Sequence, residues 1–380
     1  MQIKYKTSDY FSLFKHIAIG VNFFTWLKIL SKFRYKVAFP FLPKAVFITM
    51  TSLVNLPFQL LEKVLFQRKV KAINVPPPLF ILGHPRSGTT YLYHVLSQDP
   101  QLAFCTTNDA LVPNIMLTFG KVTAFILGAF MPKSRPQDNV KSGPYLPEEE
   151  EFGVANMSTV SFMHGFYFPN ALLSNFRESV LFEHSDQRAK KEWQEQFAYF
   201  IRKLTYKNKG KTLLVKSPAN TGRIKEILEV FPDARFIHIH RNPYEVYQSN
   251  GKLYENVLPL LSLQKADNAA VEEYLLTSYR EMHQKFLAEK ALIPTGQFYE
   301  MSYADFVTHP VERLEKAYQH LNLEGFEMAL PHLKTEIRSS EGYQKNQHST
   351  LNPEVMEKIN TQWDFFFEAY GYSIEEPTNA

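Results

Sequence analysis

Apolar and polar positions change their spacing in a characteristic way between residues 79 and 97. Leu79 to Leu82 is a short apolar run, which predicts a buried strand. Residues 83–88 then form a turn with a glycine at each end, and glycine allows close backbone approach and positive φ. From Thr89 onward apolar residues recur three and four positions apart, which predicts a helix with one buried stripe. A strand, a glycine-bearing turn and a helix N-terminus in this order predict an anion-binding site, because the unpaired amides and the helix dipole point at the turn.

The rest of the chain beyond residue 74 alternates between strand and helix patterns. We expect further strands at residues 104–107, 213–215 and 235–240, a helix that starts at Asn242, and a last helix over residues 353–367. This alternation predicts an α/β fold for residues 75–380, with a mainly parallel sheet flanked by helices in the style of P-loop proteins. Functional side chains should then gather at the carboxyl ends of the strands.

Residues 1–74 have a different character from the remainder. They hold twelve Lys and Arg side chains against two acidic ones, a net charge of +10, whereas the remaining chain has a net charge of −6. Aromatic residues are interleaved with the basic ones, which is typical of helices that lie in a membrane surface. We expect a basic, aromatic, helical N-terminal extension that either lies in a membrane surface or packs on the core with a solvated basic face. No recognition motif accompanies the charge, so nucleic-acid binding is not predicted.

The apolar stretches of this extension do not predict a signal peptide or a membrane span. Polar and charged residues interrupt the first 22 positions and no small-residue cleavage site follows. Ala45 to Leu61 is the longest uncharged run, and its 17 residues fall short of the ~20 that a spanning helix needs. An amphipathic helix is the expected structure.

Composition adds two limits. With 45% hydrophobic residues and 21% charged residues, the body can bury a full core. The single cysteine, Cys105, excludes a disulfide framework and a cysteine metal cluster, and fits a reducing cytosol. The histidines show no ligand spacing, so no metal is expected.

The turn after the first strand resembles a P-loop only in part. Gly83 and Gly88 have the P-loop spacing, but Thr89 stands where an ATP-cleaving site needs a lysine. Arg86 is the only cation in the turn, and its planar fork suits a phosphate or sulfonate that is held rather than cleaved. A small-molecule kinase is therefore a weaker alternative.

Two sequence blocks resemble the sulfotransferases that use 3′-phosphoadenylyl sulfate (PAPS). Pro85-Arg-Ser-Gly-Thr-Thr90 is similar to their 5′-phosphosulfate loop, and Arg241 and Ser249 have the eight-residue spacing of the pair that holds the 3′-phosphate in that family. The resemblance extends over residues 79–372. It implies the same fold, PAPS as co-substrate without a metal, and donor-binding residues Arg86, Ser87, Gly88, Thr89, Thr90, Arg241 and Ser249, with Lys345 in a loop that closes over the nucleotide.

The resemblance also implies a catalytic lysine but leaves the general base open. Lys216 matches the lysine that contacts the transferring sulfonate. The histidine that follows it in the cytosolic enzymes is replaced by Pro218, which cannot take a proton. Four consecutive glutamates at residues 148–151 are the alternative, because crowded, partly buried carboxylates can have a raised pKa; they can equally be a solvated first helical turn. Glu151 and then Glu150 are our first candidates, and His164 is the competing base.

The acceptor is predicted from apolar stretches. Ala110 to Met131 is an apolar run that reads equally as a core helix or as the wall of an acceptor pocket. With the basic, aromatic extension, it favours a sterol or lipid alcohol as acceptor and a cytoplasmic enzyme that is peripheral on the inner face of the membrane. A sulfotransferase for carbohydrates or other small hydroxyl compounds, and a membrane-surface scaffold without catalysis, are the alternatives. The sequence does not indicate an oligomeric state.

Overall fold

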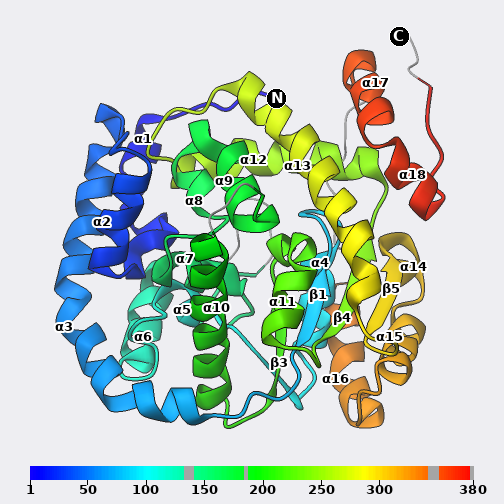
Figure 1. Cartoon of the computed structure of the whole chain (residues 1–380), viewed down its shortest axis with the longest axis horizontal. Helices are drawn as coiled ribbons and strands as arrows, with labels where there is room; N and C mark the ends of the chain where they lie inside the picture. The colour runs from blue at the N-terminus through cyan, green and yellow to red at the C-terminus, as the bar shows by residue number, and fades with distance from the viewer. Residues whose placement is uncertain (132–140, 184–186, 341–350, 377–380) are drawn as a thin grey trace.

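The computed structural model describes residues 1–131, 141–183, 187–340 and 351–376, and its centre is a five-stranded parallel sheet of order β2-β3-β1-β4-β5 (Figure 1). The strands are β1 (Leu79–Leu82), β2 (Leu102–Phe104), β3 (Thr212–Lys216), β4 (Arg235–His240) and β5 (Phe298–Ser302). The α-helices are α1 (Thr7–Tyr10), α2 (Phe23–Lys32), α3 (Leu42–Ala72), α4 (Thr89–Leu96), α5 (Thr107–Leu111), α6 (Gly120–Phe130), α7 (Glu150–Met157), α8 (His164–Tyr167), α9 (Leu172–Phe176), α10 (Gln187–Lys207), α11 (Ile224–Val230), α12 (Pro243–Leu261), α13 (Asn268–Glu289), α14 (Tyr303–Thr308), α15 (Pro310–His320), α16 (Phe326–Ser339), α17 (Pro353–Gln362) and α18 (Asp364–Tyr370). The predicted α/β fold is confirmed.

The central strand β1 explains how the sheet is covered on both faces. Phe80 and Leu82 belong to a hydrophobic cluster with α10 and α11, whereas Leu79 and Ile81 belong to a cluster with α4, α15 and α16. Alternate side chains of a strand point to opposite faces, so a strand that is covered twice must be apolar at every position. This is why Leu79 to Leu82 reads as a continuous apolar run.

The strand order brings the three functional segments of the chain together. β1 pairs with β3 on one side and with β4 on the other, and all three run parallel. Their carboxyl ends therefore lie at one edge, where β1 leads into residues 83–88, β3 ends at Lys216 and β4 is followed by Arg241. Segments about 130 and 155 residues apart in sequence become neighbours by sheet topology alone.

Two of the expected elements differ from the observed ones. The strand expected at residues 104–107 is β2, two residues earlier, because Thr106 caps α5: its hydroxyl accepts from the Asp109 amide and its own amide donates to the Asp109 carboxylate. The last helix is two helices, α17 and α18, which meet at Trp363.

The N-terminal segment packs on the body through one side. Ile17, Trp26, Phe41 and Ile48 are buried in a hydrophobic cluster that also contains residues of α8, α9, α12 and α13. In Figure 1 α2 and α3 cover the side of the molecule opposite β5. The alternative of packing on the core thus holds for the inner side of this segment, and the division of the chain at residue 74 stays a prediction.

The 31-residue helix α3 is longer than the uncharged run within it and continues through Pro57. By length and composition, residues Phe39–Ala72 are apolar enough to cross a membrane, and 28% of the apolar window is buried inside the protein. Two buried charges join α3 to the body. Lys44 Nζ donates to the carbonyl oxygens of Pro259 and Leu260, and Glu62 forms an ion pair with Lys203.

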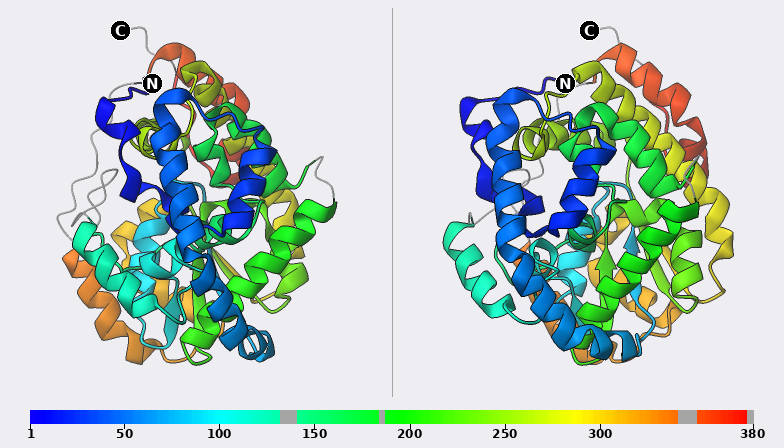
Figure 2. Two further views of the ribbon diagram at one scale, coloured as in Figure 1. Left: turned by 90° about the vertical axis from the view of Figure 1, so that its left-hand side faces the viewer. Right: turned by 60° about the vertical axis from the view of Figure 1, so that its left-hand side comes forward.

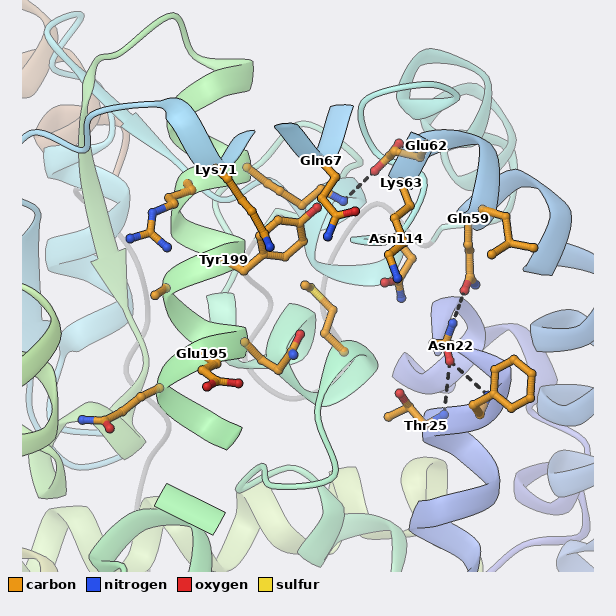
Figure 3. A pocket seen from close by; sticks show the side chains of 18 of the residues that line it. Asn22, Thr25, Gln59, Glu62, Lys63, Gln67, Lys71, Asn114, Glu195 and Tyr199 are labelled. Carbon is orange, nitrogen blue, oxygen red and sulfur yellow. Dashed lines mark hydrogen bonds and ion pairs between the residues drawn. The ribbon is translucent and has the colours of Figure 1, made fainter. Parts of the chain in front are cut away.

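A cavity of about 1060 Å³, lined by both polar and apolar side chains, lies between α2, α3 and α10 (Figure 3). Gln59, Lys63 and Lys71 line it from α3, and Glu195 and Tyr199 line it from α10. Along this stretch the inner side of α3 therefore borders a cavity and does not pack into a hydrophobic core.

Candidate active site

The loop after β1 has a backbone that only particular residues tolerate. Gly83, Arg86 and Gly88 have φ values of 145°, 73° and 103°. A Cβ atom at Gly88 would lie 2.3 Å from the Tyr303 ring, so the chain passes too close to α14 for a side chain. The Gly83 amide donates to Thr221 Oγ1 at 2.8 Å, which ties the start of the loop to the segment after β3.

Side chains inside and beside the loop fix its shape. Ser87 Oγ donates to the His84 carbonyl oxygen at 2.7 Å, and Asn250 Nδ2 of α12 donates to the Pro85 carbonyl oxygen at 3.0 Å. Burial lowers the pKa of His84 to about 3, so its ring is neutral at pH 7. Ser87 and Thr89 are buried, whereas Arg86 and Thr90 are partly exposed. The hydrogen bonds of Ser87 and Asn250 fix the loop backbone, and Arg86 lies at the open, partly exposed side of the loop.

Arg86, Arg241 and Ser249 meet at this open side. Arg86 Nε donates to Ser249 Oγ at 2.8 Å, and Arg241 Nη1 donates to the Arg86 carbonyl oxygen at 3.2 Å. The Arg241 guanidinium lies 4.6 Å from the centre of the Tyr303 ring and forms an ion pair with Glu245, one turn into α12. The Arg86 guanidinium contacts the Ser249 hydroxyl directly, and the Arg241 guanidinium is joined to them through the Arg86 backbone. Guanidinium and hydroxyl donors of this kind suit phosphate groups.

Lys216 lies at the end of β3 beside the glutamates that precede α7. Its Nζ is 2.7 Å from Glu149 Oε1 and 5.6 Å from the centre of the Tyr93 ring on α4. The Lys216 side chain is 2% exposed and the Glu149 side chain 18% exposed. The Lys216 ammonium is therefore shielded from solvent, and the Glu149 carboxylate lies between it and the more exposed side of the pair.

The next two glutamates have separate environments. Glu150 is buried, and its Oε1 accepts from Asn220 Nδ2 at 2.6 Å. Its Oε2 and the Asn220 Oδ1 atom are buried without a hydrogen-bond partner among the described residues. Burial raises the pKa of Glu150 to about 7. A proton on the Glu150 carboxyl near neutral pH would give its buried Oε2 atom a hydrogen to donate.

Glu151 is drawn inward, as expected, but toward a structural partner. Arg223 Nη1 lies 2.7 Å from Glu151 Oε2, and both side chains are 0% exposed. Ser161 Oγ and the Phe162 amide each donate to Glu151 Oε1 at 2.8 Å. The carboxylate is surrounded by donors within the core, which is the geometry of a structural ion pair and leaves no side open to a substrate.

The competing base predicted from the sequence, His164, does not join this group. His164 is fully buried, its Nε2 lies 3.1 Å from the Ala155 carbonyl oxygen, and burial lowers its pKa to about 4. Lys345 lies outside the described residues. Among the described residues, no group of three or more His, Cys, Asp or Glu side chains is placed to hold a metal ion.

A small apolar pocket opens between the loop and the segment that follows Lys216. Its lining comes from the loop, the segment before α8, α9, the turn after β3, α12 and α13: His84, Pro85, Phe162, Phe176, Pro218, Ala219, Tyr254, Tyr274, Leu275, Ser278 and Met282. Most of these residues belong to the hydrophobic cluster that buries the N-terminal segment. The run Ala110–Met131 does not contribute to this lining, and its helix α6 exposes Val122, Phe125, Ile126 and Phe130.

Sequence reasoning missed three residues of this site. Glu149 was within the glutamate run but was not singled out, because adjacency in sequence does not tell which carboxylate faces β3. Asn250 and Tyr303 lie on helices that meet the loop only in the folded chain. The position of Asn250 directly after Ser249 was the one available signal.

Comparison with known proteins identifies the family. The sulfotransferase family model matches residues 77–327. The omega-hydroxy-beta-dihydromenaquinone-9 sulfotransferase Stf3 of Mycobacterium tuberculosis and of Mycobacterium bovis is 30% identical over 366 residues, which cover 95% of this chain and 92% of that protein. The crystal structure of sulfotransferase STF9 from Mycobacterium avium has a TM-score of 0.67 at 19% identity over 93% of each chain. That of STF1 from M. tuberculosis has a TM-score of 0.60 at 16% identity, over 89% of this chain and 90% of that one. The chain belongs to the sulfotransferase family.

Proposed function

We propose that the protein transfers the sulfonate group of PAPS to the hydroxyl group of a hydrophobic lipid alcohol. The observation that carries this proposal is the convergence of Arg86, Arg241 and Ser249 beside the glycine loop, with Lys216 at the end of the neighbouring strand. PAPS carries an isolated 3′-phosphate and a 5′-phosphosulfate, so it needs two anion sites at one sheet edge.

The donor is held at both ends. The loop amides at the start of α4 and the Arg86 side chain take the 5′-phosphosulfate, with Ser87, Gly88, Thr89 and Thr90 setting the loop backbone. Arg241 and Ser249 take the 3′-phosphate. Glu245 holds Arg241 in the described structure, and it is 46% exposed, so a phosphate with up to two charges displaces it at little cost.

Transfer needs a base on the acceptor and a cation on the leaving group. The acceptor oxygen attacks sulfur in line, a new S–O bond forms, and the bond from sulfur to the bridging oxygen of the phosphate breaks. The acceptor proton passes to a carboxylate, and adenosine 3′,5′-bisphosphate leaves. We assign the base to Glu149 and the stabilising cation to Lys216, because they contact each other at the mouth of the site. Glu151 is reassigned to a structural role.

The acceptor follows from the pocket and from the relative. The lining beside the loop is mostly aromatic and aliphatic and offers few partners for sugar hydroxyls. The pocket holds only about 10 Å³ in the described structure, so an apolar chain enters it only when the lining side chains move apart. Stf3, 30% identical to this chain, is named for a menaquinone derivative that bears a terminal hydroxyl. A lipid with an apolar chain that ends in an alcohol is therefore the acceptor class that we propose.

Calorimetry with product nucleotides tests the donor site. Adenosine 3′,5′-bisphosphate should bind more tightly than AMP, and Arg241→Ala should weaken the bisphosphate by about 1.5–3 kcal/mol while AMP changes little, since AMP lacks the 3′-phosphate. Glu245→Gln is the matched control and should bind the bisphosphate at least as tightly as the unaltered protein. Equal affinities for AMP and the bisphosphate would rule this assignment out.

A further inference from the structure

The outward side of α3 carries a continuous apolar stripe. Seven exposed residues follow one another at steps of one, three, four and seven positions along the helix: Val46, Met50, Leu53, Val54, Leu61, Val64 and Leu65. Such spacing places them on one face of a helix. Nothing in the described structure covers this face, although the opposite side of α3 packs on the body.

Helix α6 extends this stripe sideways. Its exposed residue Phe130 lies near α3, because the Phe14 ring contacts both Phe130 and Phe47 of α3, at 5.5 and 5.1 Å between ring centres. Phe125 is exposed on the same helix. The Phe58 and Phe119 rings make a second link at 5.0 Å. In the left view of Figure 2, α3 and α6 face the viewer together. We call the exposed residues of these two helices the α3–α6 face.

The charges around the α3–α6 face have one sign. Glu62 is the only carboxylate between residues 39 and 72, and it is buried in its ion pair with Lys203. Helix α6 contains Lys121 and no acidic residue. The last turns of α3 add two exposed basic side chains that do not line the cavity, Arg68 and Lys69. An apolar stripe that ends in cations and exposes no carboxylate matches a surface that is apolar inside and negatively charged outside.

We propose that the α3–α6 face binds the surface of an anionic lipid bilayer, with α3 lying in the plane of the membrane. The helix does not cross the bilayer, because crossing would pull Lys44 away from two carbonyl oxygens and separate Glu62 from Lys203. The inner side of α3 borders the cavity of Figure 3, and its outer side carries the apolar stripe. Packing against a hydrophobic core therefore does not explain why the outer side is apolar.

The position of the face also bears on the reaction, and this step rests on the proposed function. The apolar pocket beside the loop and the inner side of α2 and α3 share one hydrophobic cluster. An enzyme docked through the α3–α6 face would hold this cluster close to the bilayer in which a lipid alcohol is dissolved.

Vesicle flotation of the full-length protein tests the proposal without any activity assay. The unaltered protein should float with vesicles of phosphatidylcholine mixed with phosphatidylglycerol and bind pure phosphatidylcholine more weakly. The triple variant Val64→Ser, Phe125→Ser, Phe130→Ser removes side chains that are 82%, 82% and 67% exposed, and should lower vesicle affinity at least about tenfold. A second variant, Arg68→Gln, Lys69→Gln, should lose about fivefold per charge on the anionic vesicles only.

The matched control removes apolar residues elsewhere on the surface. Leu292→Ser, Met328→Ser, Ile374→Ser changes residues that are 52%, 60% and 53% exposed and should leave vesicle binding unchanged. Bisphosphate binding and circular dichroism check that each variant is folded. If the apolar variant does not fold, the charge variant still tests the proposal. Unchanged flotation of folded variants would overturn the proposal. So would a dimer in light scattering that only the apolar variant disrupts, with no vesicle binding, because the face would then bind a second copy of the chain.

Discussion

Lys216 and Glu149 are held together at the edge of the sheet by two different constraints. β3 fixes Lys216 at its last residue, and α7 begins one residue after Glu149. The 2.7 Å contact therefore depends on a strand end and a helix start rather than on a flexible loop. This rigidity is what a base and a leaving-group cation need, because both act only when the reacting atoms are aligned.

Glu149→Gln tests the assignment of the base. The amide keeps the shape of the side chain but cannot accept the acceptor proton, so turnover should fall by about 10²–10⁴ while bisphosphate affinity changes only a few-fold. Stopped assays of sulfonate transfer together with calorimetry give both quantities. Glu150→Gln is the neighbouring control. If Glu149→Gln is fully active and Glu150→Gln is not, the base is Glu150.

The raised pKa of Glu150 leads to a prediction about how the stability of the fold depends on pH. Its pKa is raised from 4.5 to about 7 by burial, so the protonated form stabilises the fold below about pH 4.5 and this contribution is lost as the pH rises through about 7. Glu150→Gln cannot lose a proton. Its unfolding free energy relative to the unaltered protein should therefore increase between about pH 5 and pH 8, by up to roughly 3 kcal/mol. Denaturant titrations at several pH values measure this difference, and a pH-independent difference would contradict the assignment.

At this scale the sequence predicted the residue types better than their partners. The glutamate run and Lys216 were visible, but Glu151 was preferred because it is next to Phe152. Its actual partner, Arg223, is 72 residues away and comes from the segment after β3. Neither spacing nor charge within residues 148–151 carries that information, because the ion pair exists only once β3 and α7 are in place.

Elements were predicted best where periodicity is decided locally. The strand at residues 79–82, the helix from Thr89 and the strand at residues 235–240 have their expected bounds. The misplaced strand at residues 104–107 gave way to the capping of α5 by Thr106. The apolar runs within residues 45–61 and 110–131 were ambiguous for a different reason, since apolar composition does not tell a buried face from an exposed one.

Glu62 is the side chain that fastens α3 to the body. One of its oxygens accepts from the Leu117 and Thr118 amides, and the other pairs with Lys203. Glu62→Gln should lower the unfolding free energy by about 3 kcal/mol, because it leaves the Lys203 ammonium buried without a counter-charge. Glu229→Gln breaks the partly exposed pair with Lys190 and should cost less than about 1 kcal/mol. Similar losses for both variants in denaturant unfolding would show that Glu62 has no special role.

The whole molecule joins the proposed donor site at the sheet edge to an apolar pocket and an exposed apolar face. The fold and the strand, turn and helix of residues 79–96 could be predicted from the sequence, because they depend on short, continuous segments. The apolar pocket could not, because its lining comes from positions between residues 84 and 282 that are scattered over the loop, the segment before α8, α9, the turn after β3, α12 and α13. Most of its lining residues share one hydrophobic cluster with the N-terminal segment.

An assay of sulfonate transfer from labelled PAPS to a panel of acceptors tests whether the enzyme sulfates a hydrophobic lipid alcohol. The panel should contain long-chain isoprenoid alcohols, a sterol, a simple phenol and a soluble oligosaccharide, each presented with anionic vesicles, with products identified by mass spectrometry. We expect a lipid alcohol to gain one sulfonate group fastest, and Glu149→Gln to form this product at least about 100-fold more slowly. Faster sulfation of the oligosaccharide than of every lipid alcohol and sterol would contradict this expectation.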